Sequence, residues 1–470
     1  MTNRTEKDSL GEVEVPKEAY YGAFTVRANH NFQISGIKSP KAFKKALSTV
    51  KMAAAKANST LKVITKSQEK AIERACLELI DGKFDQEFLL DVFQAGAGTS
   101  YNMNANEIIA NRANEILGGK KGKYEHVHPN NHVNQAQSTN DVMPTSTRIA
   151  ILSMLPALLE EIKKLESELN KKAKAEKNTL KVGRTHLMDA VPITMGQEFD
   201  AYKEALVKSR QFIEVQSKDL HILGIGGTAL GTGINTDPDF RKLVVNELSL
   251  ITGLKLKSAK NLTETTNNMN SFMNFSAGLR SLATNLLNLA GDLKLMNMGP
   301  KAGISEIELP AVQPGSSIMP GKINPSIPEC MEMICFQVFG NDKTIEISAQ
   351  RSQFDLNVMC PVIMFNLLQS MEILTRGIHM LRTLALQNLK VNRKQIKDTF
   401  ERSLCTATAL APYIGYLETS DVVKSALKKG ITIKEEVLNR KLLSTKDLDE
   451  MLSVKSTTRP KRIKTQTPKH

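Results

Sequence analysis

A short polar segment at residues 315–325 holds the side-chain types that could act on an anionic substrate. It reads GSSIMPGKINP, so two hydroxyls, an ammonium and a carboxamide lie among glycines and prolines. Glycine lets the backbone bend and proline prevents regular structure, which predicts a loop. Lys322 offers a positive charge to a carboxylate or phosphate, Asn324 offers a second donor, and Ser316 or Ser317 can exchange a proton. We interpret the segment as a lid over an anion, although a plain surface connection has a similar composition.

Residues 96–100 form a second candidate element. They read GAGTS, and a Gly-x-Gly turn that opens a helix presents backbone N–H groups and hydroxyls to an anion. The same residues are also common as an ordinary helix N-cap. This motif is therefore a weak signal when it stands alone.

Residues 129–141 form a third candidate element. They read PNNHVNQAQSTND and contain almost no apolar side chain. Such a stretch is expensive to bury without partner groups, which favours a role in binding. The alternative is an exposed turn that Asn140 or Asp141 caps before the next helix.

Residues 183–189 read GRTHLMD and form a fourth element. His186 follows the hydroxyl of Thr185 and precedes the acid Asp189, in another stretch that interrupts a helical pattern. A lone histidine is more often structural than catalytic. As a functional group, its tautomer would be set by Asp189 or by a distant carboxylate.

Long helical patterns separate these polar stretches. Between residues 144 and 169, apolar side chains recur at intervals of three and four, which predicts an amphipathic helix. Similar patterns with few strand signals favour a mainly α fold built around a long helix bundle. The other predicted helices span residues 39–57, 66–80, 196–223, 265–298, 328–347 and 356–386, with shorter ones at 394–409, 419–430 and 433–442.

The order of these patterns predicts three domains. Residues 1–139 are expected to form an N-terminal, mostly helical domain with a strand at 12–15. Residues 140–393 are expected to form the central long-helix domain that carries the loop at 315–325. Residues 394–470 are expected to form a small C-terminal helical domain that ends in a basic, disordered tail.

Composition indicates a cytoplasmic protein with no membrane partner. Hydrophobic residues make up 41% of the 470 residues, and no apolar run approaches the roughly 18 residues of a membrane span. The N-terminus is polar and mixed in charge, unlike a secretory signal. The five cysteines are odd in number and lack CxxC spacing, which predicts buried free thiols and no zinc site.

The formal net charge of +14 raises a nucleic-acid hypothesis. Six of those charges lie between Lys455 and His470, in a segment without acids. A short basic end is more often a solvated tail than a binding element, so we expect no nucleic-acid partner. The remaining charge would draw an anionic substrate toward a cleft.

The string GSSIMPGKINP resembles the signature of the fumarase/aspartase superfamily, and the similarity runs nearly end to end. It also covers the strings GAGTSYNMNANE, HVNQAQSTND, GRTHLMDAVPITMGQEF and GGTALGTGIN. Within the superfamily, the chain looks more like the aspartate ammonia-lyases at residues 20–22, 327–329 and 365–370.

This resemblance implies a homotetramer with a multi-helix core, in which three subunits build each active site. It implies reversible anti-elimination of ammonia from L-aspartate, a dicarboxylate, to give fumarate. No cofactor and no metal are expected. Fumarate hydratase, which acts on malate and fumarate, is the alternative, followed by a noncatalytic member of the superfamily.

Site roles are carried over from the resemblance residue by residue. Ser316 matches the general base that removes the proton on carbon 3 and produces an enediolate. Its alkoxide would need stabilisation by backbone donors of the loop and by nearby positive charge. The other catalytic positions are His186, Lys322 and Glu329, of which Glu329 would orient the histidine. The substrate-binding positions are Thr99, Ser138, Thr139, Asn140, Thr185, Ser317, Met319 and Asn324.

Two departures from the aspartase pattern concern the groups around the site. Residues 350–352 read QRS where the ammonia-lyases usually read EAG, and Cys360 stands where they usually carry glutamate. The signature residues themselves are intact. We therefore expect catalytic competence together with a changed surrounding shell.

Overall fold

The computed structural model describes residues 2–460, and α-helices account for most of them, as the periodicity predicts. Contacts divide the chain into two units. The first holds residues up to Leu159 together with Ser209–Ala283 and Cys335–Thr375. The second holds Glu160–Lys208, Thr284–Ile334 and the residues from Arg376 onward. The three-domain division remains a prediction.

Five long helices contribute residues to both units. They are α5 (Thr139–Ala175), α6 (Met195–Gln216), α9 (Asn270–Met296), α10 (Ser326–Ala349) and α11 (Cys360–Leu381). Their central turns are buried and apolar, as the spacing of three and four requires. The predicted helices at 144–169 and 328–347 are confirmed, and both run a few residues further than predicted.

The helix predicted at 265–298 is two helices, so that prediction is wrong in one respect. α8 (Leu262–Asn267) ends before Asn268, whose backbone is extended, and α9 then begins. The Asn268 side chain accepts a hydrogen bond of 2.7 Å from the N–H of Asn270. Asparagine satisfies helix N-termini in this way, so a break occurs inside an otherwise continuous apolar pattern.

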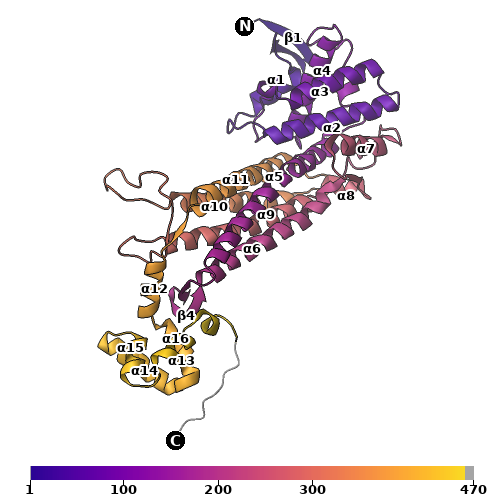
Figure 1. Ribbon diagram of the computed structural model, residues 1–470. Coiled ribbons are helices and arrows are strands. Elements are labelled where there is room, and N and C mark those ends of the chain that lie inside the picture. The colour runs from indigo at the N-terminus through magenta and orange to yellow at the C-terminus, as the bar shows by residue number, and fades with distance from the viewer. Residues whose placement is uncertain (1, 461–470) are drawn as a thin grey trace. The chain divides into compact units, whose positions relative to one another are not determined.

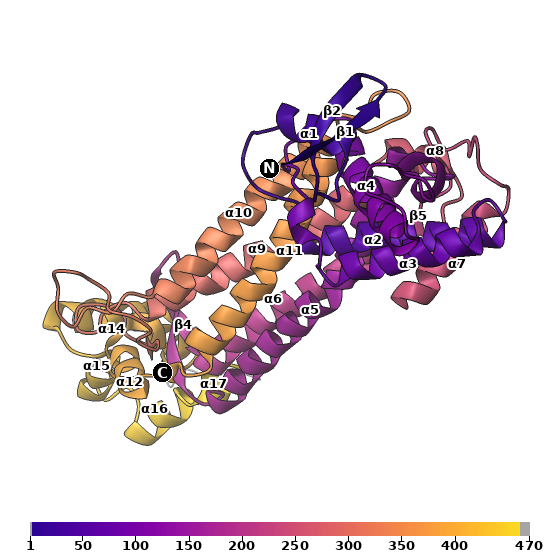
Figure 2. The same ribbon diagram turned by 90° about the horizontal axis from the view of Figure 1, so that it is seen from above.

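The first unit begins with the antiparallel hairpin of β1 (Asn3–Asp8) and β2 (Gly11–Pro16), which confirms the predicted strand. Helix α2 lies beside α3 and α7 (Figures 1 and 2). α2 is rich in alanine and buries most of its length, because small side chains allow close packing. The remaining bounds are α1 Ala23–Asn31, α2 Lys41–Thr60, α3 Lys66–Ile80, α4 Thr99–Ile116, α7 Phe240–Thr252, β5 Ile222–Leu223 and β6 Lys257–Ser258.

The second unit contains a β-hairpin where the sequence predicts only an irregular polar stretch. β3 (Leu180–Thr185) pairs antiparallel with β4 (Met188–Thr194). A second short pair joins β7 (Ile307–Glu308) to β8 (Lys390–Val391). α12 (Arg393–Arg402) lies against β3.

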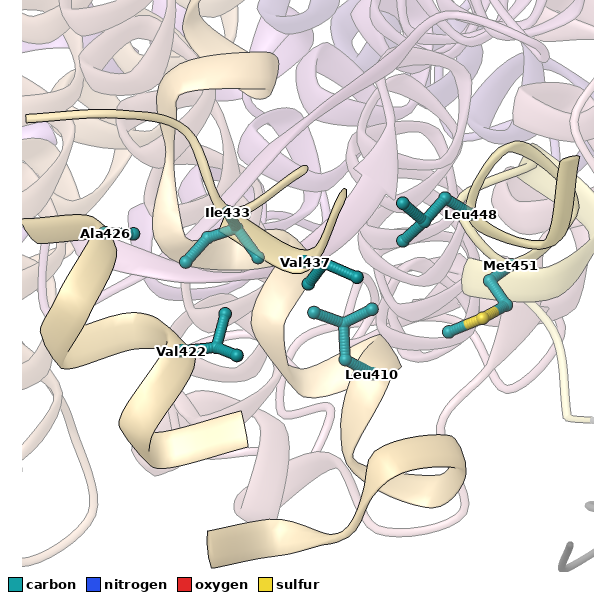
Figure 3. Packing of buried hydrophobic residues seen from close by; sticks show 7 residues of the cluster. All are labelled: Leu410, Val422, Ala426, Ile433, Val437, Leu448 and Met451. Carbon is teal, nitrogen blue, oxygen red and sulfur yellow. The ribbon is translucent and has the colours of Figure 1, made fainter. Parts of the chain in front are cut away.

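Small helices follow α12, near the positions that the sequence predicts. Seven buried apolar side chains from four of these helices point toward one another and form a local core (Figure 3). They are Leu410, Val422, Ala426, Ile433, Val437, Leu448 and Met451. The helices are α13 Ala407–Ile414, α14 Tyr416–Lys429, α15 Ile433–Asn439, α16 Thr445–Met451 and α17 Val454–Thr457. The predicted basic tail therefore starts with a short helix, and its last part, 461–470, lies outside the described residues.

One helix, α5, is long and apolar enough to cross a membrane by length and composition alone. Its most apolar window is 72% buried inside the protein. The core helix of a globular domain has the same properties, so this helix is explained by its packing.

Candidate active site

Loop 310–325, the segment that runs into α10, closes on itself through hydrogen bonds. The N–H of Gly315 donates to the carbonyl of Lys322 at 2.8 Å, and the Asn324 amide donates to the carbonyl of Gly315 at 2.7 Å. A Cβ atom at Gly315 would clash with that Lys322 carbonyl, so only glycine allows this closure. Asn324 therefore holds the loop as well as offering a polar group.

Ser316 is half-buried, and its hydroxyl oxygen faces backbone donors of its own loop. Oγ accepts hydrogen bonds from the N–H groups of Ile318 at 3.2 Å and Met319 at 3.0 Å. Two N–H donors aimed at one oxygen favour negative charge on that oxygen. The loop thus supplies the kind of donors that a serine base requires.

A cavity of about 410 Å³ lies within the same loop, between residues 311 and 323. Ser316, Met319 and Lys322 all line it. Ser317, Met319 and Lys322 are exposed, so the ammonium of Lys322 is available to an anion. The cavity therefore brings together three of the predicted loop residues, and Asn324 supports the loop that carries them.

Thr185 and His186 lie at the exposed tip of the hairpin of β3 and β4. Only His186 and Leu187 connect the strands, with φ values of 55° and 63°. A two-residue hairpin loop of type I′ takes positive φ at both positions, which asparagine and glycine normally occupy. Two larger residues in this conformation store strain, which is often found at functional sites.

Glu329 lies in the first turn of α10 and is half-buried. Its N–H donates to the carbonyl of Pro325 at 3.2 Å, at the end of the loop. Within residues 2–460 of one chain, no hydrogen bond or ion pair joins Glu329 to His186. The expected pairing of these two residues therefore requires a group from another subunit or a change of conformation.

Thr99 is the first residue of α4, behind the predicted glycine turn. Its hydroxyl donates to the carbonyl of Gly96 at 2.7 Å, and Gly98 takes a φ of 96°. A Cβ atom at Gly98 would lie 2.6 Å from the Met143 side chain, so glycine allows close packing here. The N–H of Thr99 already donates to the carbonyl of Gly96 at 2.9 Å, and the positive end of the helix dipole at this N-terminus favours a nearby anion.

Thr139 and Asn140 begin α5, a second helix N-terminus in the same unit. Asn102, one turn after Thr99, donates to the Thr139 hydroxyl at 3.2 Å. Ser138 Oγ accepts from the N–H of Asn140 at 3.2 Å. Four predicted substrate-binding residues of the first unit are therefore grouped around two helix N-termini.

Asp141 and Lys51 support this group from within, a role that their sequence context does not indicate. Asp141 is 2% exposed and accepts from the N–H groups of Gly226 at 3.0 Å and Thr228 at 2.9 Å. Burial raises the pKa of Asp141 to about 7, whereas these hydrogen bonds and Lys51 lower it. The Asn140 amide donates to the carbonyl of Ala229 at 2.8 Å. The glycine-rich turn at 224–233 is thus the scaffold that holds Asn140.

Cys360, one of the departures, lies in a buried position next to α5. Its sulfur lies 3.9 Å from the Thr147 hydroxyl, and burial raises its pKa to about 11. The neighbouring Arg148 is 3% exposed, donates to Ser271 Oγ at 2.8 Å and lies 4.6 Å from the centre of the Phe272 ring. Within the described residues, no carboxylate forms an ion pair with Arg148.

Comparisons with known proteins agree with this arrangement. A family model for lyases matches residues 11–340, and a model for the fumarase C C-terminus matches residues 407–459. An aspartate ammonia-lyase from a Bacillus species is 44% identical over 97% of this chain and 98% of its own length. A class II fumarate hydratase from Brucella suis biovar 1 is 42% identical over 96% and 97%, respectively. A solved fumarate lyase:delta crystallin from Brucella melitensis superposes with a TM-score of 0.93 at 42% identity, over 96% of this chain and 98% of that one. The chain therefore has a fumarase-like fold and belongs to the lyase family that includes the aspartate ammonia-lyases and class II fumarases.

Proposed function

We propose that this protein catalyses the reversible elimination of ammonia from L-aspartate to give fumarate. The observation that carries the proposal is the pair of N–H donors, from Ile318 and Met319, on Ser316 Oγ. Lys322 lines the same cavity and adds positive charge. Together these groups favour a serine oxygen that accepts a proton.

The reaction begins when Ser316, as the alkoxide, removes the proton on carbon 3 of aspartate. The electron pair moves onto the adjacent carboxylate and forms the enediolate. That pair then forms the double bond between carbons 2 and 3, and ammonia leaves carbon 2 with the electrons of the broken C–N bond. The base therefore ends protonated and must release its proton before the next turnover.

The two carboxylates of the substrate need different partners. The enediolate gains negative charge during the reaction, so we assign it to donors near helix N-termini and to the loop: Thr99, Ser138, Thr139 and Ser317. The other carboxylate keeps its charge and is assigned to Thr185, Lys322 and Asn324. Asn140 and His186 face the ammonium, Met319 contacts the substrate, and Glu329 orients His186.

We propose a homotetramer in which three subunits build each site. Support comes from exposed apolar side chains on α10: Met333 is 66%, Phe336 57% and Ile347 50% exposed. Met333, Phe336 and Gly340 follow one another at intervals of three and four, which is the spacing of a helix-packing seam, and Ile347 lies one heptad after Gly340. The exposed hairpin tip, where Leu187 is 73% exposed, also fits insertion into a neighbouring subunit.

Fumarate hydratase is the second candidate, because a class II fumarate hydratase is nearly as similar to this chain as an aspartate ammonia-lyase is. The two reactions share the base and the carboxylate partners and differ in the leaving group. A noncatalytic role is the third candidate, motivated by Cys360. A cytosolic location without nucleic-acid or membrane partners is part of the same proposal.

The test follows fumarate by its ultraviolet absorbance, with L-aspartate and L-malate as separate substrates. We expect product from aspartate, and a Ser316→Ala variant that is at least about a hundredfold slower, as for loss of an essential catalytic group. Ile318→Ala is the matched control, since Ile318 lies in the same loop with its side chain 84% exposed. Product from malate alone would establish the hydratase instead, and no product from either would overturn the proposal.

A further inference from the structure

Hairpin β3–β4 contacts the segment that leads into loop 310–325 at one buried carboxylate, that of Glu306. Glu306 is 1% exposed and lies just before β7, on the segment that leads into the loop. Lys181 Nζ lies 2.7 Å and Arg184 Nη1 2.8 Å from its two carboxylate oxygens, and both cations belong to β3. The hairpin that ends in Thr185 and His186 is therefore tied by charge to the stem of the loop that carries Ser316.

A β-bulge lies between the two cations of β3. Side chains three positions apart on a regular strand point to opposite faces of the sheet. The register of β3 with β4 shifts between Val182 and Arg184, where two residues of β4, Ala190 and Val191, stand opposite Gly183 alone, so the extra residue belongs to β4. Lys181 and Arg184 contact the same carboxylate from either side of this irregularity.

The backbone of Glu306 is fixed as firmly as its side chain. Its N–H donates to the carbonyl of Met296 at 2.9 Å, at the end of α9, and its carbonyl accepts from the N–H of Asn392 at 2.8 Å. Three residues later, the N–H of Leu309 donates to the Asn297 side chain at 2.9 Å. The loop therefore starts from a stem that cannot shift without breaking several buried hydrogen bonds.

Lys181 has a second carboxylate partner that does not lead to the loop. Glu198, in the first turn of α6, lies 2.6 Å from Lys181 Nζ. Burial raises the pKa of Glu198, and the charges of Glu306 and Asp292 add to that rise, whereas Lys181 opposes it. Glu198 and Glu306 thus share one cation but belong to different segments.

We propose that Glu306 is a positioning residue, which holds the hairpin carrying Thr185 and His186 in a fixed relation to the stem of the Ser316 loop. The role rests on the proposed function, because it matters for turnover only if both segments contribute to active sites. Replacement of the carboxylate by an amide would leave Arg184 without its ion pair and Lys181 with Glu198 alone. Both segments would then move independently, and the reacting groups would lose their alignment.

Hydrogen exchange of the full-length protein, followed by mass spectrometry, tests this link between the hairpin and the loop stem without any assay of activity. In Glu306→Gln we expect exchange to speed up about tenfold in residues 180–194 and also in residues 310–325, a change that reflects easier local opening. Glu198→Gln is the matched control, and it should leave residues 310–325 unchanged. Faster exchange in the hairpin alone, or equal acceleration across both units, would overturn the proposal.

A milder variant covers the case in which Glu306→Gln does not fold. Arg184→Met removes one of the two ion pairs of Glu306 and keeps the buried pair with Lys181. Arg184 is also the more exposed of the two cations. We expect the same two segments to exchange faster, by a smaller factor. No change in residues 310–325 would count against the role of Glu306.

Kinetics separate a positioning role from a general loss of folded protein. We expect Glu306→Gln to lower kcat/KM for aspartate about tenfold to a hundredfold, the usual range for a group that orients active-site residues. Glu306→Asp, which keeps the charge, should recover part of the loss. An inactive wild-type protein would refute the proposed function. The hydrogen-exchange result alone would then decide whether Glu306 holds the hairpin and the loop stem together.

Discussion

Lys51 donates a hydrogen bond of 2.9 Å to Asn134 Oδ1 from a position in α2 where its side chain has no exposure to solvent. A second bond of 2.9 Å runs to Gln137 Oε1. Asn102 and Asn106 of α4 also donate to Asn134 Oδ1, at 3.1 and 3.2 Å. One buried cation thus anchors the polar segment that leads to Ser138, Thr139 and Asn140. Burial lowers the pKa of Lys51 to about 7, and the charge of Asp141 opposes that shift.

Replacement of Lys51 by methionine should disturb the substrate-binding segment more than the fold. The acceptors of Asn134 and Gln137 would lose a donor in a buried place, which costs about 1–3 kcal/mol of unfolding free energy. We expect the rate with aspartate to fall about tenfold or more, as for the loss of a side chain that orients a binding group. Thermal unfolding and initial rates check this, with Lys45→Met, an exposed lysine on the same helix, as the control. Wild-type rates in Lys51→Met would contradict the anchoring role.

Arg148 should be a source of instability in the isolated chain. Burial lowers the pKa of this guanidinium to about 10, and Cys360 is neutral at the position where the aspartase pattern has glutamate. Buried charges without a counter-charge are unfavourable, so Arg148→Met should raise the unfolding free energy by about 1 kcal/mol after the loss of the Ser271 bond. Denaturant unfolding measures the change. A loss of about 3–5 kcal/mol would instead mean that another subunit supplies a carboxylate to Arg148.

The matched control for that experiment is Arg112→Met. Arg112 forms ion pairs with Glu78, at 2.6 Å, and with Glu115. Its removal should destabilise the protein, since it leaves Glu78 without its closest partner. We expect the unfolding free energy to rise in Arg148→Met and to fall in Arg112→Met. This difference would confirm that the missing carboxylate, and not the loss of an arginine as such, decides the outcome.

The C-terminal helices should be the acid-sensitive part of the second unit. Hydrogen bonds from Lys429, Ser425 and Arg440 hold the pKa of Glu436 at about 2, below its usual value of 4.5. A carboxylate with a lowered pKa contributes stability above pH 4.5, and this contribution is lost as the pH falls from 4.5 toward 2. Circular dichroism melts at pH 7 and pH 3 should show a smaller difference for Glu436→Gln than for the wild type. An equal difference in both proteins would contradict this role of Glu436.

Helices were predictable from the sequence because their signal is local. The spacing of apolar side chains in α5 and α10 reports which face is buried, whatever the partner. The hairpin β3–β4 was not predictable in this way, because its turn uses His186 and Leu187 where glycine and asparagine usually mark such turns. The strands are short, and their polar residues look like those of a loop.

The residues that support the site could not be predicted from the sequence, for a different reason. Glu306 and Lys181 lie far apart in the sequence, so neither segment alone indicates their ion pair. Lys51 lies in an alanine-rich helix, and a charged residue there looks like an ordinary exposed lysine. The loop residues Ser316 and Lys322 were recognisable because the whole signature lies in one short segment.

The proposed dependence of the site on assembly can be tested directly at the exposed apolar residues of α10. Phe336→Glu places a charge on the proposed seam, where desolvation of that charge opposes helix packing. We expect light scattering to report a tetramer for the wild type and a smaller species for the variant, and the rate with aspartate to fall at the same protein concentrations at which the larger species is lost. Phe354→Glu is the matched control, because Phe354 is 98% exposed and lies in a turn outside α10. A tetramer that survives Phe336→Glu would place the subunit contacts on another surface, and a monomer with full activity would refute the sharing of active sites between subunits.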